Sequence, residues 1–251
     1  MKLIINADDC GISPRVDEQI ELFIKAKKIS SATIMANRED FEGAIKLYEK
    51  YKDSISFGIH LNLTDGCPMI ENDDLVQTGH YILHDGSIQY NMKDVTKRKL
   101  TVKQRKYIYL ELKAQIDKLL MAGVKISHID SHHHIHTDIN ILPIVIKLAK
   151  EYKIKKIRGL RNYMPLSFNK MLRNGWYGYL KTIFSKVVTT DYYTSYMDFY
   201  NRFNSGFVIT DAVIELGCHP GHQRYELESK VILTSNICDL TNASLINYNE
   251  L

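Results

Sequence analysis

Side chains that can bind a metal ion or carry a proton gather at a few points of the 251-residue sequence. The densest group is residues 128–136, HIDSHHHIH, which contains a run of histidines near its end. A buried histidine needs hydrogen-bond partners, so such a cluster does not fill a core economically. Neutral imidazole is a good ligand for zinc, nickel, iron or cobalt. The stretch therefore favours a metal site over an exposed histidine-rich loop.

The spacing within residues 128–136 suggests how these side chains are arranged. Alternate residues of a strand point to the same face, which would place on one face His128, Asp130, His132, His134 and His136. Asp130 could instead orient a ligand histidine from behind, because carboxylates commonly fix the ring of a metal-bound imidazole. The spacing alone leaves open which histidines bind the metal and which bind the substrate.

Asp8 and Asp9 are two adjacent carboxylates directly after an apolar run. Neighbouring residues of a regular strand face opposite ways, so the chain must bend before Gly11 if both serve one site. Two close carboxylates repel each other unless a cation or a shared proton lies between them. One could then bind a metal and the other could act as a general base. A turn that starts a helix is the structural alternative.

Three further residues could take part in the same chemistry. His60 is the one ionisable side chain in the apolar run 57–63, where it could be a core histidine or a metal ligand. His219 follows another apolar run and could protonate a leaving group or cap a loop. Arg158 could hold a carboxylate in place, because a buried arginine is rare without a partner; exposure at a strand edge is the alternative.

Short apolar runs alternate with helical patterns along the chain, which predicts a series of strand–helix units. Strands are expected over residues 2–7, 31–36, 55–63, 125–132, 155–160, 186–190 and 213–218. Helices are expected from Pro14 onward, over 39–51, 101–122 and 139–152, and within 165–185.

This alternation predicts a parallel α/β sheet with right-handed crossovers. Seven countable strands suit a TIM-like (β/α) barrel of seven or eight strands better than the alternative, a doubly wound open sheet. The carboxyl ends of the strands would then bring all the groups above to one rim. We expect one domain over residues 1–251, with an insertion at about 65–99. Within it, Asp85-Gly86 predicts a hairpin over 81–88 and the insertion is a candidate lid.

Composition narrows the function further. A chain with 45% hydrophobic and 10% aromatic residues is not disordered. It has no apolar stretch of about 18 residues, so we expect no membrane partner. The net charge is only +4, and the basic run at 97–106 is read as a solvated face, with no nucleic-acid partner. Four cysteines without a C-x-x-C pair, and a start unlike a signal peptide, predict a reduced, cytoplasmic protein.

Four motifs carry a specific likeness to known proteins. They are Asn6-Ala7-Asp8-Asp9, Gly58-x-His60-x-x-Leu63-Thr64-x-Gly66-x-Pro68, His128-x-Asp130-Ser131-His132-His133-His134-x-His136 and Glu215-x-x-Cys218-His219-Pro220-Gly221. Together they resemble the YdjC-like carbohydrate deacetylases, a family that includes chitooligosaccharide deacetylases. The resemblance covers residue 2 to about residue 235.

The resemblance implies a β/α barrel related to polysaccharide deacetylases, which hydrolyses the N-acetyl group of a small sugar or chitooligosaccharide with one divalent ion, magnesium or zinc. It implies that Asp9, His60 and His132 are the metal ligands, with Asp8 as the base and His219 as the acid. Asp130, His134, His136 and Arg158 would contact substrate or support the ligands. The sequence departs from the family at Cys10, where phenylalanine is common, which bears on the shape of the pocket. Sugar stacking or core packing would explain the aromatic residues Tyr163, Trp176 and Tyr177.

Two other functions stay open on the sequence. A metal phosphoesterase or another amidohydrolase on a similar barrel would need a second metal and more carboxylate or lysine ligands. A metal- or sugar-binding protein without catalysis would not need both Asp8 and His219. Convincing nucleophile-elbow and phosphate-loop signatures are missing from the sequence. A homodimer is the expected assembly, because it is the commonest one.

Overall fold

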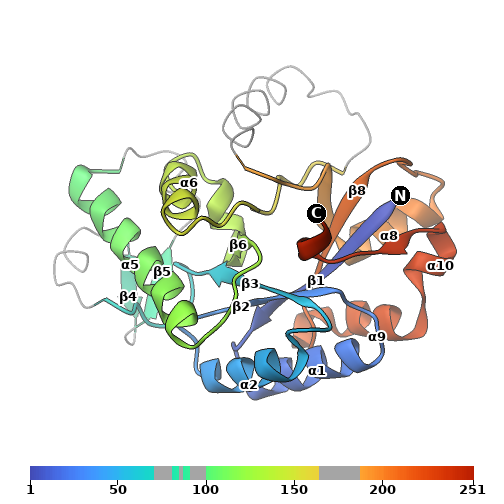
Figure 1. Ribbon diagram of the computed structural model, residues 1–251, viewed down its shortest axis with the longest axis horizontal. Coiled ribbons are helices and arrows are strands. Elements are labelled where there is room, and N and C mark those ends of the chain that lie inside the picture. The colour runs from blue at the N-terminus through green and yellow to red at the C-terminus, as the bar shows by residue number, and fades with distance from the viewer. Residues whose placement is uncertain (71–80, 85–86, 91–99, 164–186) are drawn as a thin grey trace.

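A computed structural model describes residues 1–70, 81–84, 87–90, 100–163 and 187–251 of the protein (Figure 1). Six parallel strands form one curled sheet in the order β6-β3-β2-β1-β8-β7, and the short β9 pairs with β1. The strands are β1 (Lys2–Cys10), β2 (Ser31–Ile34), β3 (Ser56–Leu61), β6 (Ile129–Ser131), β7 (Tyr192–Ser195), β8 (Val213–Cys218) and β9 (Ser244–Leu245). A separate hairpin joins β4 (Tyr81–His84) to β5 (Ser87–Tyr90), which confirms the hairpin predicted within the insertion.

Helices lie around the outside of the curled sheet (Figure 1). They are α1 (Pro14–Lys25), α2 (Phe41–Tyr51), α5 (Val102–Met121), α6 (Leu142–Glu151), α8 (Tyr196–Asn204), α9 (Glu226–Thr234) and α10 (Ile237–Thr241), with 3-10 turns η1 (His132–Thr137), η2 (Gln223–Tyr225) and η3 (Tyr248–Glu250). Local signals fix several ends. Thr101 and Gln104 form a capping box at the start of α5, which satisfies orphan amides there. In the part of the chain that the structure describes, no helix is long and apolar enough to cross a membrane.

The strand order decides between the two predicted architectures. From β1 the chain moves to β2, β3 and β6 on one side, and it later returns through β7 to β8, which pairs with the other edge of β1. A doubly wound sheet instead moves outward a second time beyond its first strand. The strands here follow one rotational direction, as they do in a (β/α) barrel, so the open-sheet alternative is wrong.

A full barrel of seven or eight strands is not confirmed. The predicted strand 125–132 shortens to β6, and the predicted strands 155–160 and 186–190 make only isolated bridges in the described chain. These bridges join Ile129 to Ile157, Lys156 to Val188 and Arg161 to Tyr193. We call residues 155–161 the bridged segment, because they link β6 to β7 through single backbone contacts. β7 and α8 were not predicted, and residues 165–185, where further helices were expected, lie outside the described residues.

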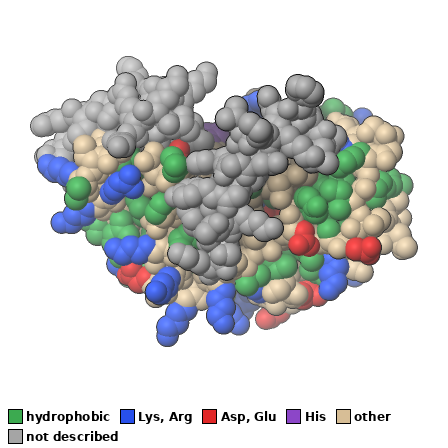
Figure 2. Space-filling model, turned by 90° about the horizontal axis from the view of Figure 1, so that it is seen from above, with side chains coloured by type: hydrophobic (Ala, Val, Ile, Leu, Met, Phe, Trp, Pro, Cys, Tyr) green, Lys and Arg blue, Asp and Glu red, His purple; other side chains and the backbone are tan. Residues whose placement is uncertain are grey.

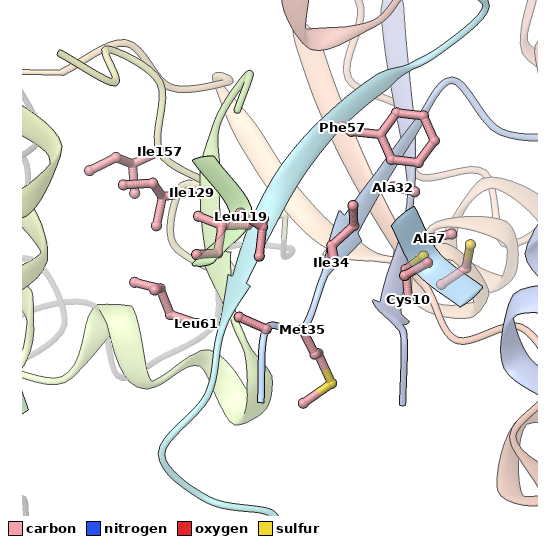
Figure 3. Close-up of a cluster of buried hydrophobic side chains, with 14 of the residues drawn as sticks. Ala7, Cys10, Ala32, Ile34, Met35, Phe57, Leu61, Leu119, Ile129 and Ile157 are labelled. Carbon is pink, nitrogen blue, oxygen red and sulfur yellow. The ribbon is translucent and has the colours of Figure 1, made fainter. Parts of the chain in front are cut away.

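The two faces of the sheet differ in chemistry. Along β1, Leu3, Ile5 and Ala7 join the apolar core between sheet and helices, while Ile4 packs in a separate small cluster and Asn6 bonds to Asp8. Figure 3 shows part of this core, with side chains from β1, β2, β3 and β6. The apolar layer thus lies outside the curled sheet, and the interior of the curl is mostly polar.

Cys10 belongs to that outer core. Its side chain is fully buried among apolar neighbours (Figure 3), and burial, together with Asp17, raises the pKa of its thiol. The Cys10 side chain therefore faces the core, whereas its neighbours Asp8 and Asp9 face the interior.

Lysine and arginine side chains lie mostly along the left and lower parts of the face seen in Figure 2, with hydrophobic and some acidic side chains between them. Within the predicted basic run, Arg105 lies on α5 and donates to Asn140. Residues 97–99 of that run lie outside the described residues. This distribution agrees with the interpretation of the run as part of a solvated face.

Gly58 on β3 is required because His128, just before β6, lies very close to it. A Cβ at this position would lie 2.5 Å from Cε1 of His128 and 2.7 Å from its carbonyl oxygen. We expect Gly58→Ala to lower the free energy of unfolding by about 1–3 kcal/mol, because the backbone oxygen cannot move aside. Urea titration measures this change. Gly159→Ala is the control, since its nearest neighbour at 2.7 Å is the Thr189 hydroxyl, a side-chain atom. Equal stability of Gly58→Ala and wild type would contradict the expectation.

Candidate active site

The two carboxylates at the end of β1 both point into the site because the strand is irregular there. The pairing with β2 shifts register between Ala7 and Cys10, and Asp9 has a φ of 66°. That left-handed conformation is uncommon for a residue with a side chain and marks a constrained position. The bend expected from the adjacent carboxylates is confirmed, and Asp8 and Asp9 are both buried.

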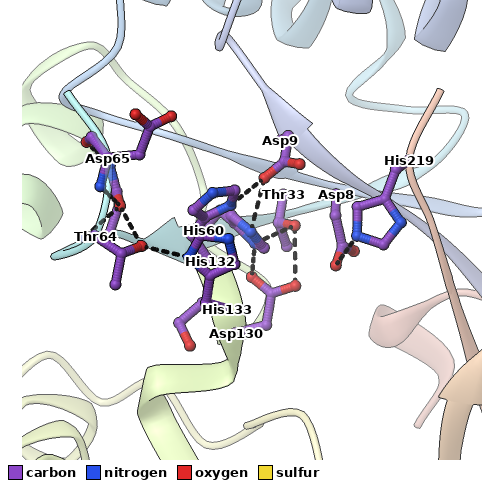
Figure 4. A network of polar contacts seen from close by, with 12 residues as sticks. Asp8, Asp9, Thr33, His60, Thr64, Asp65, Asp130, His132, His133 and His219 are labelled. Atoms are coloured by element: carbon purple, nitrogen blue, oxygen red, sulfur yellow. Dashed lines mark hydrogen bonds and ion pairs between the residues drawn. The ribbon is translucent and has the colours of Figure 1, made fainter. Parts of the chain in front are cut away.

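Asp9 lies among three histidines, two of which, His60 and His132, are seen beside it in Figure 4. Its Oδ1 is 2.7 Å from Nδ1 of His132 and 3.1 Å from Nε2 of His60, and its Oδ2 is 3.1 Å from Nε2 of His222. Burial would raise the pKa of the Asp9 carboxyl, but its close contacts with these histidines hold it well below its ordinary value. The side chain is therefore an anion in the middle of an imidazole cluster.

Asp130 fixes the ring of His60 from the opposite side. Its Oδ1 is 2.7 Å from Nδ1 of His60, and its Oδ2 accepts a hydrogen bond from Thr33 at 3.0 Å. Burial lowers the pKa of His60, yet Asp130 and Asp9 outweigh it and raise the value to about 10. A carboxylate on Nδ1 leaves Nε2 to face Asp9, the arrangement by which a carboxylate orients a metal-bound histidine. Asp130 thus has the supporting geometry that the sequence suggested.

The expectation that five alternating residues of 128–136 share one face is wrong. β6 ends at Ser131, and the chain turns into η1, in which His133 and His134 both have left-handed backbones with φ of 52° and 57°. His132 consequently turns to Asp9, whereas His133 is exposed and contacts Thr64. A strand that ends before the cluster cannot maintain alternation, and two successive left-handed residues reverse its direction.

His134 and His136 lie deeper, around the interior. His136 is fully buried with Nδ1 2.5 Å from the Ser131 hydroxyl, and burial holds its pKa well below the ordinary value. Burial and the nearby Arg158 charge lower the pKa of His134 to about 3. Both rings are neutral at physiological pH. Nδ1 of His134 and Nε2 of His136 are buried without a hydrogen-bond partner, so each keeps an unused polar atom.

Arg158 reaches the interior from the bridged segment and binds three carboxylates. Its Nη1 and Nη2 each donate to Asp8 at 2.7 Å, Nη2 also lies 2.8 Å from Asp130, and Nε donates to Glu215 at 2.7 Å. The guanidinium is fully buried and lies 4.6 Å above the Tyr193 ring. The expectation that Arg158 holds a carboxylate is confirmed, and strand-edge exposure is excluded.

Asp8 and His219 form the other half of the site (Figure 4). Nε2 of His219 is 3.9 Å from Oδ2 of Asp8, and the ring stacks on Tyr225 with centroids 4.4 Å apart. Burial would raise the pKa of Asp8, but Arg158 holds it well below the ordinary value. Burial would lower the pKa of His219, yet Glu228 and Asp8 raise it. The structure thus pairs an ionised carboxylate with a readily protonated imidazole.

Sequence reasoning missed several members of this site. Glu215 occurs in the fourth motif without an assigned role, and His222 lies directly after that motif. The signal for Glu215 was available, because one carboxylate inside the apolar run 213–218 requires a buried partner. Glu228, which accepts from the His219 amide at 2.7 Å, gave no such signal. Tyr163 is buried against Phe199, so its role is packing, and Trp176 and Tyr177 lie outside the described residues.

The donor set fits a divalent ion. Asp9, His60 and His132 offer ligand atoms that all lie within 4.8 Å of one another. Nε2 of His222 is buried beside them and has no hydrogen-bond partner of good geometry. The ligand atoms of a second group, Asp8 with His60 and Asp130, are also close together, but the Arg158 guanidinium already binds both of its carboxylates. The geometry therefore accommodates one ion at Asp9 better than two.

Comparison with known proteins places this site in a family. The sequence model of the YdjC-like protein family matches residues 2–244. The chain belongs to the YdjC-like family. This confirms the resemblance seen in the motifs, and the matched range includes every candidate site residue described above.

Relatives within the YdjC-like family carry the name carbohydrate deacetylase. A Brevibacillus brevis protein of that name is 38% identical over 154 residues, which make up 61% of this chain and 58% of that protein. The chain thus spans less than two thirds of this relative. A Clostridium beijerinckii carbohydrate deacetylase is 28% identical over 99% of this chain and 94% of its own.

A solved structure shows the same fold. A protein of Enterococcus faecalis V583, assigned provisionally to cellobiose-phosphate cleavage, superposes with a TM-score of 0.75 at 23% identity. The superposition covers 99% of this chain and 98% of that one. The likeness extends over both chains and therefore supports the curled parallel sheet as a whole.

Metal binding can be tested directly at the histidines. We expect His60→Ala and His132→Ala each to weaken zinc binding about 10-fold or more, because each removes one of three candidate ligands. Elemental analysis after dialysis and titration calorimetry measure the occupancy and the affinity. His133→Ala is the matched control, since this neighbour of His132 is exposed and bonds to Thr64. Wild-type occupancy in both ligand variants would exclude this ligand set.

Proposed function

We propose that this protein is a metal-dependent carbohydrate N-deacetylase, a hydrolase that removes the acetyl group from a small N-acetylated sugar or chitooligosaccharide. One observation carries the proposal. The adjacent carboxylates Asp8 and Asp9 diverge, so that Asp9 meets His60 and His132 while Asp8 meets Arg158 and lies near His219. The proposed metal ligand Asp9, base Asp8 and acid His219 therefore occupy distinct positions within one site.

Amide hydrolysis needs an activated water, a stabilised oxyanion and a protonated leaving amine. A divalent ion held by Asp9, His60 and His132 would lower the pKa of a bound water and polarise the acetyl oxygen. The ligand set of one carboxylate and two imidazoles suits zinc or a similar transition metal, whereas magnesium prefers oxygen ligands. On these grounds we favour zinc of the two metals implied by the sequence.

Asp8 is the proposed general base. Its two oxygens are fixed by Arg158 and by the Asn6 amide, which donates to Oδ1 at 2.8 Å. This anchoring orients the carboxylate and keeps it ionised, so it can accept a proton across the working pH range. The same ion pair reduces its basicity, which makes its position more important than its affinity for protons.

His219 is the proposed general acid. Glu228 and Asp8 raise its pKa above that of an ordinary histidine, which favours the protonated ring that an acid needs before it protonates a leaving amine. Stacking on Tyr225 and the 3.7 Å approach of Nδ1 to Glu228 hold the ring with Nε2 toward Asp8. Two titratable groups with opposite protonation preferences thus flank one space, the usual arrangement of an acid–base pair.

The carbohydrate deacetylases among the relatives support an N-acetylated sugar as substrate. A two-metal phosphoesterase is less well supported. Among the described residues, the second candidate metal group contains Asp8 and Asp130, and Arg158 already binds both. The direct test incubates the purified protein with N-acetylglucosamine and diacetylchitobiose, adds zinc or magnesium, and assays released acetate. Turnover that stops on chelation and returns with metal supports the proposal. Absence of acetate release with every metal and sugar would refute it.

The two carboxylates should respond differently to the same substitution. We expect Asp8→Asn to keep its metal and to lose about 10²–10⁴-fold in kcat, because an amide cannot accept the proton of water. Asp9→Asn should instead lose metal affinity and recover part of its rate in excess metal. Metal analysis and kinetics on the same preparations measure both effects. If both variants lose metal equally and recover equally, Asp8 is a ligand.

His219 should matter more for an amide than for an ester, because an amine leaves poorly without a proton. We expect His219→Gln to slow N-deacetylation by about 10²-fold and to slow hydrolysis of 4-nitrophenyl acetate much less. Since the pKa of His219 is raised, the wild-type rate should persist above the ordinary histidine range and fall at higher pH as the acid loses its proton. That fall should be absent in the variant. Equal losses on both substrates would argue for a structural role.

A further inference from the structure

Residues 244–251, here called the C-terminal segment, enter the interior of the curled sheet from the end opposite the site. β9 pairs in parallel with Lys2 and Leu3, and the amide of Ile246 donates to the Leu3 carbonyl at 2.9 Å. In Figure 1 the last turn lies at the centre of the molecule beside β8. The segment thus brings its side chains beneath the polar groups that surround the active site.

Tyr248 is the side chain that this segment inserts. It is fully buried and packs with Ile4 and Ile246, and its ring stacks on His128 with centroids 3.5 Å apart. Its amide bonds to the Ser56 hydroxyl at 3.1 Å, and its carbonyl accepts a hydrogen bond from Lys156. Contacts from the β1, β3 and β6 regions and from the bridged segment therefore fix this tyrosine.

The hydroxyl of Tyr248 donates to Oε2 of Glu215 at 2.5 Å. The other oxygen of Glu215 accepts from Nε of Arg158 at 2.7 Å, and the far side of the same guanidinium forks onto both oxygens of Asp8. A planar guanidinium held at Nε has its Nη1 and Nη2 directions determined. A continuous series of short hydrogen bonds thus runs from Tyr248 to the proposed base.

We propose that Tyr248 is a positioning residue for the reaction, which orients Asp8 through Glu215 and Arg158. The inference rests on the proposed function, in which Asp8 is the base. Glu215 needs the hydroxyl because it is fully buried, and burial raises its pKa to about 7 against the opposing effects of Arg158 and Tyr248. Without the hydroxyl, Oε2 would be an unsatisfied buried acceptor, and the carboxylate would rotate or take up a proton.

Tyr248→Phe tests the proposal, because it removes one oxygen and keeps the ring that packs on His128. We expect kcat for N-deacetylation to fall about 10-fold, as is usual when an outer partner of an active-site group is lost. KM and metal content should stay within about twofold of wild type, since Tyr248 contacts none of the proposed metal ligands. Tyr196→Phe is the matched control, because Tyr196 is equally buried and its hydroxyl faces Ser235 outside the series. Equal kcat in the two variants would overturn the proposal.

A second background shows whether the effect passes through Glu215. In Glu215→Gln the carboxylate is already absent, so adding Tyr248→Phe should change kcat by less than about twofold. A full 10-fold loss in that background would overturn the proposed route. If Glu215→Gln does not fold, the comparison of Tyr248→Phe with Tyr196→Phe still decides.

A readout without turnover separates this inference from the proposed function. The Nε–H proton of Arg158 can be followed by NMR after assignment with Arg158→Lys. It should shift in Tyr248→Phe and stay in place in Tyr196→Phe, because only the first variant disturbs Glu215. An unchanged signal in Tyr248→Phe would overturn the positioning role. A wild-type protein that releases no acetate would overturn the proposed function instead, and the NMR result would stand independently.

Discussion

One buried guanidinium organises the interior of this protein. Arg158 comes from the bridged segment, and its three carboxylate partners come from β1, β6 and β8. Removing one member of such a buried ionic group costs about 3–5 kcal/mol, because the remaining charge loses its compensation. Asp8 therefore has its orientation set by contacts made far below the site. The separation of Asp8 from Asp9, and with it the proposed division of chemical roles, depends on this arginine.

Much of the fold could be predicted from local pattern. Apolar runs located β1, β2, β3 and β8 to within a few residues, and Pro14 marked the start of α1. The adjacent carboxylates Asp8 and Asp9 already required a bend, because only an irregular strand can turn both to one side. The motifs identified the family, and the family's residue pattern named Asp9, His60 and His132, which the structure brings together.

Other features depend on contacts that no local pattern contains. Alternation was expected over residues 128–136, but β6 ends at Ser131, and the left-handed residues His133 and His134 follow soon after. The bridged segment pairs too briefly to give a strand, although its apolar residues suggested one. Tyr248 lies in a polar stretch, and its importance comes entirely from partners some 30 to 190 positions away in the sequence. Long-range partnership of this kind has no signature in periodicity.

Because the bridged segment pairs weakly with its neighbours, the ion pairs of Arg158 also hold it against the sheet. Between β6 and β7 the ring has isolated bridges in place of a continuous ladder, so the described backbone offers little cohesion along that arc. Arg158 links the bridged segment to β1, β6 and β8 by ion pairs. Separation of these strands would therefore also displace Asp8, the proposed base. A redesign that alters Asp8 would first need other contacts between the bridged segment and its neighbouring strands. The same Arg158 ion pairs orient Asp8 and hold these strands together.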